Sequence, residues 1–413
     1  MKRTIFSRFL IAALFGLCLI TPQASKANIY DEAQLAMDLY INDLSVGQVF
    51  IEHENLRIFL LGKPVYKHTK ENYFTLDETT DKKLLKIKEV NQYGTVNTVK
   101  MKNHSKIPVF IMKGEIITGA KQDRMASRDI IIPANKKWVE VPVFCVEHGR
   151  WHHKSKEFSS GKLCVPNSVR KTATKTACQS DVWAEISSLQ YECSVNSGTQ
   201  TVVDNYENKN IKKQLETYTE RLKNLPNLSG KTVGVVVTTG DRIICVDSFA
   251  NHSLFTRLWP KLLKSYAMDA INNGSAPTVE LEEVLELAQD IANQKPLAND
   301  CTKDKKSKLG EYFTCNCAAG TGSALIHFYP NFFAAAPEVI HCDFFPANSN
   351  NGAGRVAPPS QRRQRRGLGI HVPDNGKGLG VRILNNGRGL GVRTDQRPIW
   401  HARDDWDFGS VLE

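Results

Sequence analysis

The feature that most restricts the fold is a succession of short β-branched and aromatic segments between Val46 and Cys145. Turn-forming residues separate the segments, and the alternation in Leu85-Lys86-Ile87-Lys88 is typical of a half-buried strand. The predicted strands are 49–51, 57–61, 84–90, 95–101, 108–112, 130–132 and 138–145. The first half of the chain is therefore predicted to be rich in strands.

Longer apolar periodicities in the second half indicate helices. The predicted helices are 31–44, 181–191, 205–225, 254–271 and 279–292, and Pro260 is expected to kink or restart the fourth. A hairpin is expected at 232–246 and late strands at 324–329 and 338–344, whereas the polar, basic stretch 150–180 is expected to be a long loop. The predicted fold class is α+β, with a strand-rich N-terminal half packed with a helix-rich C-terminal half in one intertwined domain over residues 28–345.

The N-terminus has the order of a cleavable export signal. Lys2 and Arg3 give a positive start, Phe9 to Ile20 is an apolar run of 12 residues, and small residues end at Ala27. The prediction is a signal peptide over residues 1–27 and a periplasmic or secreted protein, with no transmembrane segment after cleavage. A retained anchor is less favoured because spanning takes about 20 apolar residues. A lipid anchor on Cys18 is less favoured because Leu17 precedes it.

Nine cysteines remain after the predicted signal, and an oxidising compartment favours pairing of some of them. Cys301, Cys315 and Cys317 are the best candidates because they fall in a predicted polar loop. Because the number is odd, at least one cysteine is expected to remain a free thiol or to form an intermolecular disulfide. Disulfides are expected, and their connectivity stays open.

Residues 346–413 form a basic, glycine-rich tail with three repeats of period 11, which begin at Gly367, Gly378 and Gly389. The formal net charge of the chain is +11, and residues 361–393 hold eight basic residues against one acid. The predicted polyanion-binding residues are Arg362, Arg363, Arg365, Arg366, Arg382, Arg388 and Arg393. Candidate partners are an anionic envelope component or nucleic acid, and the alternative is a solvated extension. The tail is predicted either to be disordered until bound or to form a small β module.

The segment from Gly114 to Arg124 is the leading candidate for a binding site because its glycines permit a tight turn after a strand. Lys121 and Arg124 could hold a phosphate or carboxylate, and Glu115 could act as a base or accept from a ribose hydroxyl. Gln122 adds an amide. The alternative is a structural turn locked by internal salt bridges.

Arg150 and Trp151 form a second candidate, a corner for stacking or anion binding. Glu147, His148, His152 and His153 could in principle bind zinc. Adjacent histidines in an extended chain point to opposite sides, so no metal site is predicted. Phosphate-loop, nucleophile-elbow and redox Cys-x-x-Cys motifs are lacking in the sequence, and no cofactor is predicted.

Four ordered segments resemble a known family. They are 114–124 (Gly-Glu-Ile-Ile-Thr-Gly-Ala-Lys-Gln-Asp-Arg), 141–151, 179–186 and 233–270. The chain is similar, over roughly residues 34–345, to the ARG-and-rhodanese-phosphatase-superfamily-associated domain, where ARG stands for ADP-ribosylglycohydrolase. Asp123 and His148 depart from the family pattern, which has Asn and Gln there. The family has no assigned function, so the resemblance implies at most an association with ADP-ribose enzymes.

The function predicted from these observations is that of an exported binding or scaffolding protein of unknown specific activity. Its ligand, a small molecule or a protein, would bind near Glu115, Lys121, Gln122, Arg124, Arg150 and Trp151. One alternative is an enzyme that acts on a nucleotide-derived or ADP-ribosyl substrate with Glu115 as its general base. Another is a protein that docks on the cell envelope through its basic tail.

Overall fold

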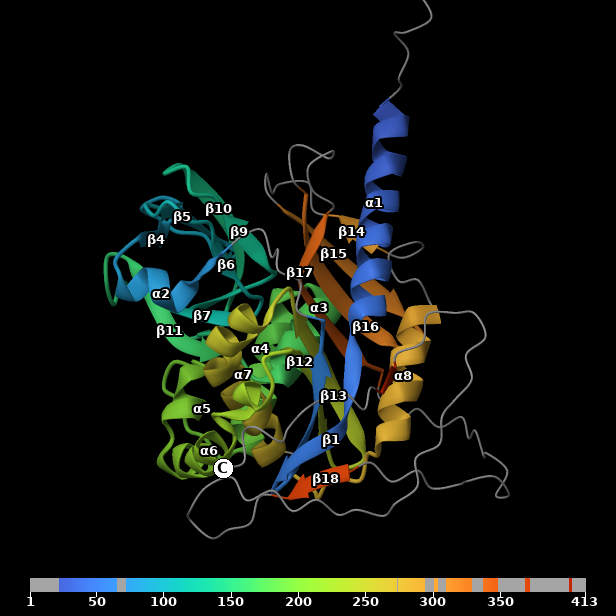
Figure 1. The fold of residues 1–413 in the computed structure, drawn as a ribbon. Helices are drawn as coiled ribbons and strands as arrows, with labels where there is room; N and C mark the ends of the chain where they lie inside the picture. The colour runs from blue at the N-terminus through green and yellow to red at the C-terminus, as the bar shows by residue number, and fades with distance from the viewer. Residues whose placement is uncertain are drawn as a thin grey trace, which may run out of the picture.

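The computed structural model describes residues 22–64, 72–272, 274–293, 301–303, 310–328, 337–347, 368–371 and 401–402. Within these ranges the strands gather into a large sheet, a closed six-stranded barrel and a small three-stranded sheet (Figure 1). Helices and strands are both abundant, so the predicted α+β class is confirmed.

The large sheet combines strands from both halves of the chain. Its order is β14 (Cys301–Lys303), β15 (Gly310–Cys317), β16 (Gly320–His327), β17 (Glu338–Pro346), β13 (Arg242–Phe249), β12 (Thr232–Thr239), β2 (Leu56–Gly62), β1 (Ser45–His53) and β18 (Leu368–His371). β19 (His401–Ala402) also pairs with β1. The strands β2 and β12 are buried along their whole lengths because both faces of the sheet are covered.

The barrel closes through β10 (Trp138–Cys145), β5 (Thr98–Asn103), β4 (Leu85–Glu89), β11 (Phe158–Cys164), β7 (Glu115–Gly119) and β8 (Arg124–Ala126). Its interior holds its own apolar core, which includes Ile87, Val99 and Val141. The small sheet comprises β3 (Phe74–Thr75), β6 (Val109–Ile111) and β9 (Ile130–Ile132).

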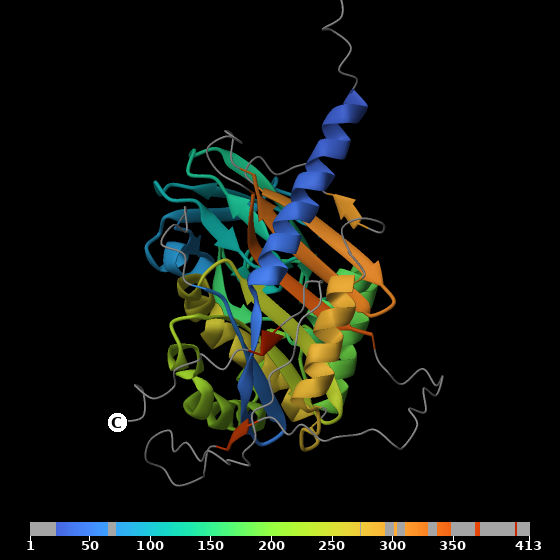
Figure 2. The ribbon, with the colours of Figure 1, turned by 45° about the vertical axis from the view of Figure 1, so that its right-hand side comes forward.

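Helices cover the large sheet on both sides (Figures 1 and 2). One face packs against α1 (Pro22–Asp43) and α8 (Leu281–Asn293). The other face packs against a group that includes α3 (Asn167–Thr176), α4 (Gln179–Glu192), α5 (Val203–Glu207), α6 (Lys209–Leu222), the 3₁₀ turn Leu225–Leu228 and α7 (His252–Asn272). The remaining helix, α2 (Leu76–Asp81), begins with a capping box formed by Thr75 and Glu78. No helix of the described ranges has the length and apolarity needed to cross a membrane.

Two expectations about irregular segments were wrong. The stretch 150–180 contains β11 and α3, because α3 buries Val169 and Ala173 together with the charged Arg170. Charge made this stretch resemble a solvated loop, whereas Arg170 is paired in the interior. Cys315 and Cys317 lie in β15 rather than in a polar loop, and no disulfide joins cysteines of the described ranges.

The predicted hairpin is present, and helices occur at the predicted positions with shifted ends, except that the single helix expected at 205–225 is divided at Asn208 into α5 and α6. α7 continues through Pro260 without interruption, and α1 begins at Pro22 rather than near residue 31. Residues 1–21 lie outside the described part of the chain, so cleavage after Ala27 stays a prediction. The seven tail arginines also lie outside it, and beyond residue 347 only β18 and β19 of the tail are described.

Candidate functional site

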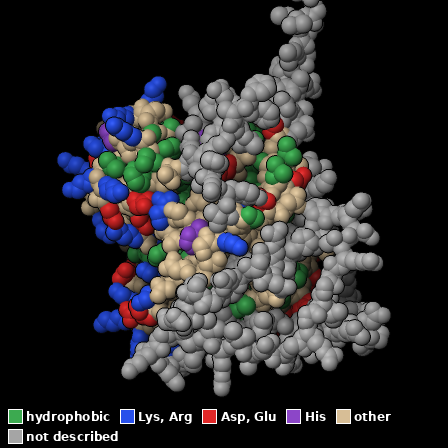
Figure 3. All heavy atoms as spheres, in the orientation of Figure 1, with side chains coloured by type: hydrophobic (Ala, Val, Ile, Leu, Met, Phe, Trp, Pro, Cys, Tyr) green, Lys and Arg blue, Asp and Glu red, His purple; other side chains and the backbone are tan. Residues whose placement is uncertain are grey.

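The mouth of the barrel is built around the turn that joins β7 to β8. Gly119 has a φ of +116°, and a Cβ atom there would lie 2.5 Å from the Ser155 hydroxyl and 2.9 Å from the Glu157 carbonyl. Glycine is therefore required at this position. The turn brings Lys121, Gln122 and Arg124 to one end of the barrel, as the sequence predicted. Figure 3 shows Lys and Arg side chains gathered along the outer edge of the barrel.

Arg150 stabilises this turn through hydrogen bonds to its residues. Its guanidinium donates to both carboxylate oxygens of Glu147, at 2.8 and 2.6 Å, and to the carbonyl of Ala120 at 2.7 Å. A further bond of 3.2 Å reaches Asp123. Burial alone would raise the pKa of Glu147, but the hydrogen bonds from Arg150 and from the backbone of Asp123 bring it below its usual value. Arg150 is therefore engaged in closing the loop through internal ion pairs.

Trp151 stands over the two cations of the turn. Its side chain is 46% exposed, and its ring centroid lies 5.3 Å from Lys121 Nζ and 5.6 Å from Arg124 Cζ. Both distances are within the range of a cation–π contact. The indole therefore offers an apolar surface to solvent with two positive charges behind it.

Arg124 is completely buried under this indole. Its Nη1 donates to Gln122 Oε1 at 2.6 Å and its Nη2 donates to the Thr95 carbonyl at 3.3 Å. Among the described residues its Nε has no hydrogen-bond partner. Burial lowers the pKa of Arg124, and the neighbouring Cys145 and Glu89 partly oppose that shift.

Glu89 is a member of the mouth that sequence reasoning missed. It is 7% exposed at the end of β4, and its Oε1 accepts from the backbone N–H of Lys121 at 3.3 Å. Its Oε2 is buried and, within the described chain, has no hydrogen-bond partner. Gly94 leaves room beside it, because a Cβ atom at this position would lie 3.1 Å from Oε2. We call Glu89, Lys121, Gln122, Arg124 and Trp151 the barrel mouth.

Glu115 does not belong to the barrel mouth. It begins β7, whereas the turn follows the other end of that strand, about 13 Å away at 3.3 Å per residue. Its buried carboxylate lies 2.5 Å from Lys261 Nζ and accepts from the Met112 N–H at 2.6 Å. Burial raises the pKa of Glu115, and the Lys261 ammonium opposes the shift. The position fits an internal ion pair between the barrel and α7.

A second polar cluster, absent from the sequence predictions, lies buried where the barrel meets the large sheet. We call it the charged junction, and it consists of Lys113, Asp129, Arg170, Asp247, His341 and Asp343. Lys113 Nζ lies 2.7 Å from Asp343, and Arg170 forms a double hydrogen bond to Asp247 at 2.9 and 2.5 Å. His341 bridges Asp129 at 2.7 Å and Asp247 at 3.2 Å.

Three side chains of the charged junction lie at a spacing that a metal ion could use. Asp247, His341 and Asp343 place one ligand atom each within 4.8 Å of one another. However, Lys113 and Arg170 already neutralise the two carboxylates at hydrogen-bond distance. Cationic side chains in these positions would repel a divalent ion, so the donor set does not fit a metal.

The histidines near Trp151 do not form a metal site either. His148 packs against Trp183 with 4.3 Å between ring centroids and the ring planes tilted by 59°, and it bonds Gln200 at 3.0 Å. Its neighbours His152 and His153 are exposed, and Glu147 is occupied by Arg150.

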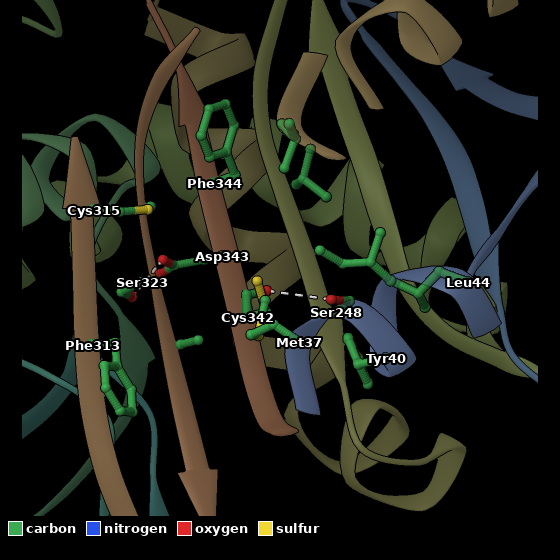
Figure 4. A pocket seen from close by; sticks show the side chains of 15 residues that line it. Met37, Tyr40, Leu44, Ser248, Phe313, Cys315, Ser323, Cys342, Asp343 and Phe344 are labelled. Atoms are coloured by element: carbon green, nitrogen blue, oxygen red, sulfur yellow. Dashed lines mark hydrogen bonds between the residues drawn. The ribbon is translucent and has the colours of Figure 1, made fainter. Parts of the chain in front are cut away.

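A small apolar cavity of about 50 Å³ lies on the face of the large sheet that α1 and α8 cover, between α1 and the strands β15 to β17 (Figure 4). Met37 and Tyr40 of α1, Phe313 and Phe344 contribute to its lining. Ser323 and Asp343 approach it from the charged junction, where they bond each other at 2.6 Å. The cavity offers space but few polar groups, which fits imperfect packing between helix and sheet better than a binding site for a polar ligand.

Comparison with known proteins gave one match. The model of the ARG and Rhodanese-Phosphatase-superfamily-associated Protein domain matches residues 43–345. No curated protein and no solved structure matched the chain. The matched residues include the barrel mouth, the charged junction and strands β1 to β17 of the fold. The chain therefore belongs to the ARG and Rhodanese-Phosphatase-superfamily-associated Protein domain family.

Proposed function

We propose that this protein is an exported binding protein whose ligand occupies the barrel mouth. One observation carries the proposal: Arg124 Nε and Glu89 Oε2 are both buried without a hydrogen-bond partner among the described residues. A buried polar atom in this state costs about 1–3 kcal/mol. Of the several such atoms among the described residues, these are the two that lie in the barrel mouth. A ligand with an acceptor for Arg124 and a donor for Glu89 would satisfy both atoms once the indole of Trp151, which covers Arg124, moves aside.

The chemistry of the mouth indicates the class of ligand. Arg124 and Lys121 favour a phosphate or carboxylate group, and the exposed indole of Trp151 favours a flat ring or a sugar face. Glu89 favours a hydroxyl or amine donor. A nucleotide-like molecule such as ADP-ribose combines a ring, hydroxyl groups and phosphates, so ADP-ribose and related nucleotides head the compounds to test.

The proposal is tested by thermal shift and by tryptophan fluorescence of the purified protein with ADP-ribose, nucleotides, sugar phosphates and divalent metals. A ligand present at one hundred times its dissociation constant stabilises the folded state by about 2.7 kcal/mol. Trp151→Ala and Lys121→Ala should weaken that binding at least tenfold and leave the fold intact, because neither side chain is fully buried. Lys213→Ala, at an exposed position on α6, is the matched control.

Unchanged binding in both Trp151→Ala and Lys121→Ala would rule out the barrel mouth as the site. The alternative with Glu115 as a general base has less support, because that carboxylate is ion-paired with Lys261 inside the protein. If turnover of ADP-ribose or a nucleotide were detected and disappeared in Glu115→Gln, the enzyme alternative would replace the present proposal.

Export is the second part of the proposal and rests on the N-terminal sequence. Cell fractionation should find the protein outside the cytoplasm, and mass spectrometry should find Asn28 as its first residue. A mature protein that still carries Met1 would contradict cleavage. In the structure, α1 continues from Pro22 past this point, so cleavage would remove the first turns of the helix and keep its contacts with the sheet from Ala33 onward.

A further inference from the structure

The outer edge of β1 is paired with a segment of the tail. β18 runs parallel to β1, with Leu368 opposite Val49, Gly369 opposite Phe50, Ile370 opposite Ile51 and His371 opposite Glu52. We propose that this edge is a binding site for an extended peptide of the type Leu-Gly-(Ile/Val)-(His/Arg), and that the three tail repeats of the same chain occupy it interchangeably. This inference is independent of the barrel mouth.

The register explains the glycine of the repeat. Phe50 packs against Phe59, with 5.5 Å between ring centroids, and against the Arg57 guanidinium at 4.1 Å. Gly369 is the residue opposite Phe50, so no second side chain competes for the space beside this ring. The flanking positions place the apolar residue types Leu368 and Ile370 opposite Val49 and Ile51 in this register.

The same register can be formed by the two later repeats. Residues 379–382 and 390–393 both read Leu-Gly-Val-Arg, which would again place leucine opposite Val49, glycine opposite Phe50 and valine opposite Ile51. The fourth position becomes Arg382 or Arg393, opposite Glu52 in place of His371. Glu52 lies at the end of the paired segment and already accepts from Arg57 at 2.7 Å. A second arginine adds charge complementarity with that carboxylate.

The chain between β17 and each later repeat is long enough for that repeat to reach the edge of β1. β17 ends at Pro346, so roughly 21 residues precede Leu368 and roughly 43 precede Leu390. By loop-closure entropy, doubling the length of a connection weakens ring closure by only about threefold. The first repeat is therefore favoured by its short connection, and the two later repeats by their arginines. An edge strand left uncovered would be open to pairing with other chains, and three interchangeable segments keep it covered.

Hydrogen exchange of the β1 amides in the full-length protein tests the proposal. Neighbouring N–H groups in a strand point to opposite sides, so two adjacent prolines remove whichever one donates to β1. Leu368→Pro with Gly369→Pro should change exchange in residues 45–53 by no more than about threefold, because another repeat takes the place of the first. The corresponding prolines in all three repeats should raise exchange at the outer-edge amides at least tenfold, while amides bonded to β2 stay protected.

The matched control is Asn350→Pro with Asn351→Pro, which lies in the tail before the repeats. Wild-type protection in the variant with all three repeats changed would show that the edge does not bind the tail. Complete loss of protection in the first-repeat variant would show that the repeats are not interchangeable. Protection in the wild type that falls on dilution from 10 to 0.1 μM would assign the strand to a second copy and overturn the intrachain proposal.

Discussion

Lys113 shows how the charges of single residues hold the interior together. Its ammonium group is fully buried and bonds Asp343, Ser323 at 2.9 Å and Thr174 at 2.6 Å. Arg170, also fully buried, reaches Asp343 at 3.3 Å as well as Asp247. The two cations keep the pKa of Asp343 below its usual value in spite of burial. Each charge in this cluster depends on a partner that comes from a distant part of the chain.

Replacing Lys113 by Met should lower the free energy of unfolding by about 3–5 kcal/mol, because Asp343 would remain as a buried and partly uncompensated charge. Urea denaturation followed by circular dichroism measures the change. The comparison is Lys212→Met on α6, whose ammonium lies 3.9 Å from Glu207 with both side chains more than half exposed. That change should cost less than about 1 kcal/mol. Equal effects of the two substitutions would contradict the importance assigned to burial.

At the scale of elements, the hairpin of β12 and β13 depends on a close approach at Gly234. A Cβ atom at this position would lie 2.2 Å from the carbonyl oxygen of Asp247 and 2.7 Å from the Cα atom of Ser248. Both contacts are with backbone, so neither neighbour can move away by a side-chain rotation. Asp247 is also a member of the charged junction, and a shift of β13 would disturb that cluster as well.

Gly234→Ala should therefore destabilise the protein by about 3 kcal/mol, at the upper end of the usual range for overpacking. Thermal unfolding measures the effect. Gly198→Ala and Gly230→Ala are matched controls, since an added Cβ atom would meet nothing within 4 Å at either position. Both should stay within about 1 kcal/mol of the wild type. A Gly234→Ala variant as stable as these controls would show that the two strands can separate at little cost.

At the scale of the whole molecule, His341 connects the barrel to the large sheet. The imidazole lies between Asp129, in the turn after β8, and Asp247 of β13. Burial alone would lower the pKa of His341, but the two carboxylates raise it to about 9. In the unfolded state the pKa of His341 is about 6.5. Between pH 6.5 and 9 the folded protein therefore keeps a proton on His341 that the unfolded protein has lost. Stability from this proton is complete below pH 6.5 and is lost as the pH rises through 9.

The free energy of unfolding should fall by about 2 kcal/mol between pH 6.5 and 8.5. In His341→Gln this decrease should shrink to less than about 1 kcal/mol, the part that Asp269 still contributes, although the variant will be less stable throughout. Burial raises the pKa of Asp269 to about 7. The stability that Asp269 contributes in its protonated form is therefore lost mostly below pH 6.5. Urea titrations at the two pH values provide the measurement. A decrease of the same size in His341→Gln would mean that another group carries the dependence.

Local sequence was sufficient for features that depend on neighbouring residues. The α+β class, the hairpin at 232–246 and the tight turn before Arg124 follow from residue periodicity and from glycine, which act over a few positions. The placement of Lys121, Gln122, Arg124 and Trp151 at one site was also predicted. These residues stand in or beside turns at the same end of two neighbouring barrel strands, β8 and β10.

Tertiary structure alone decided what each charge does. Glu115 and Arg150 looked equivalent to Lys121 and Arg124 in the sequence, but the fold paired Glu115 with Lys261 and Arg150 with Glu147 as buried ion pairs. Glu89 and the charged junction were not predicted, because Lys113, Arg170, Asp247 and His341 come together only when the barrel docks on the sheet. A charged residue has no intrinsic preference between solvent and interior until its partner is fixed, since burial is costly for a lone charge and tolerable for a paired one. Sequence patterning therefore determined the elements, and long-range electrostatic pairing determined the site.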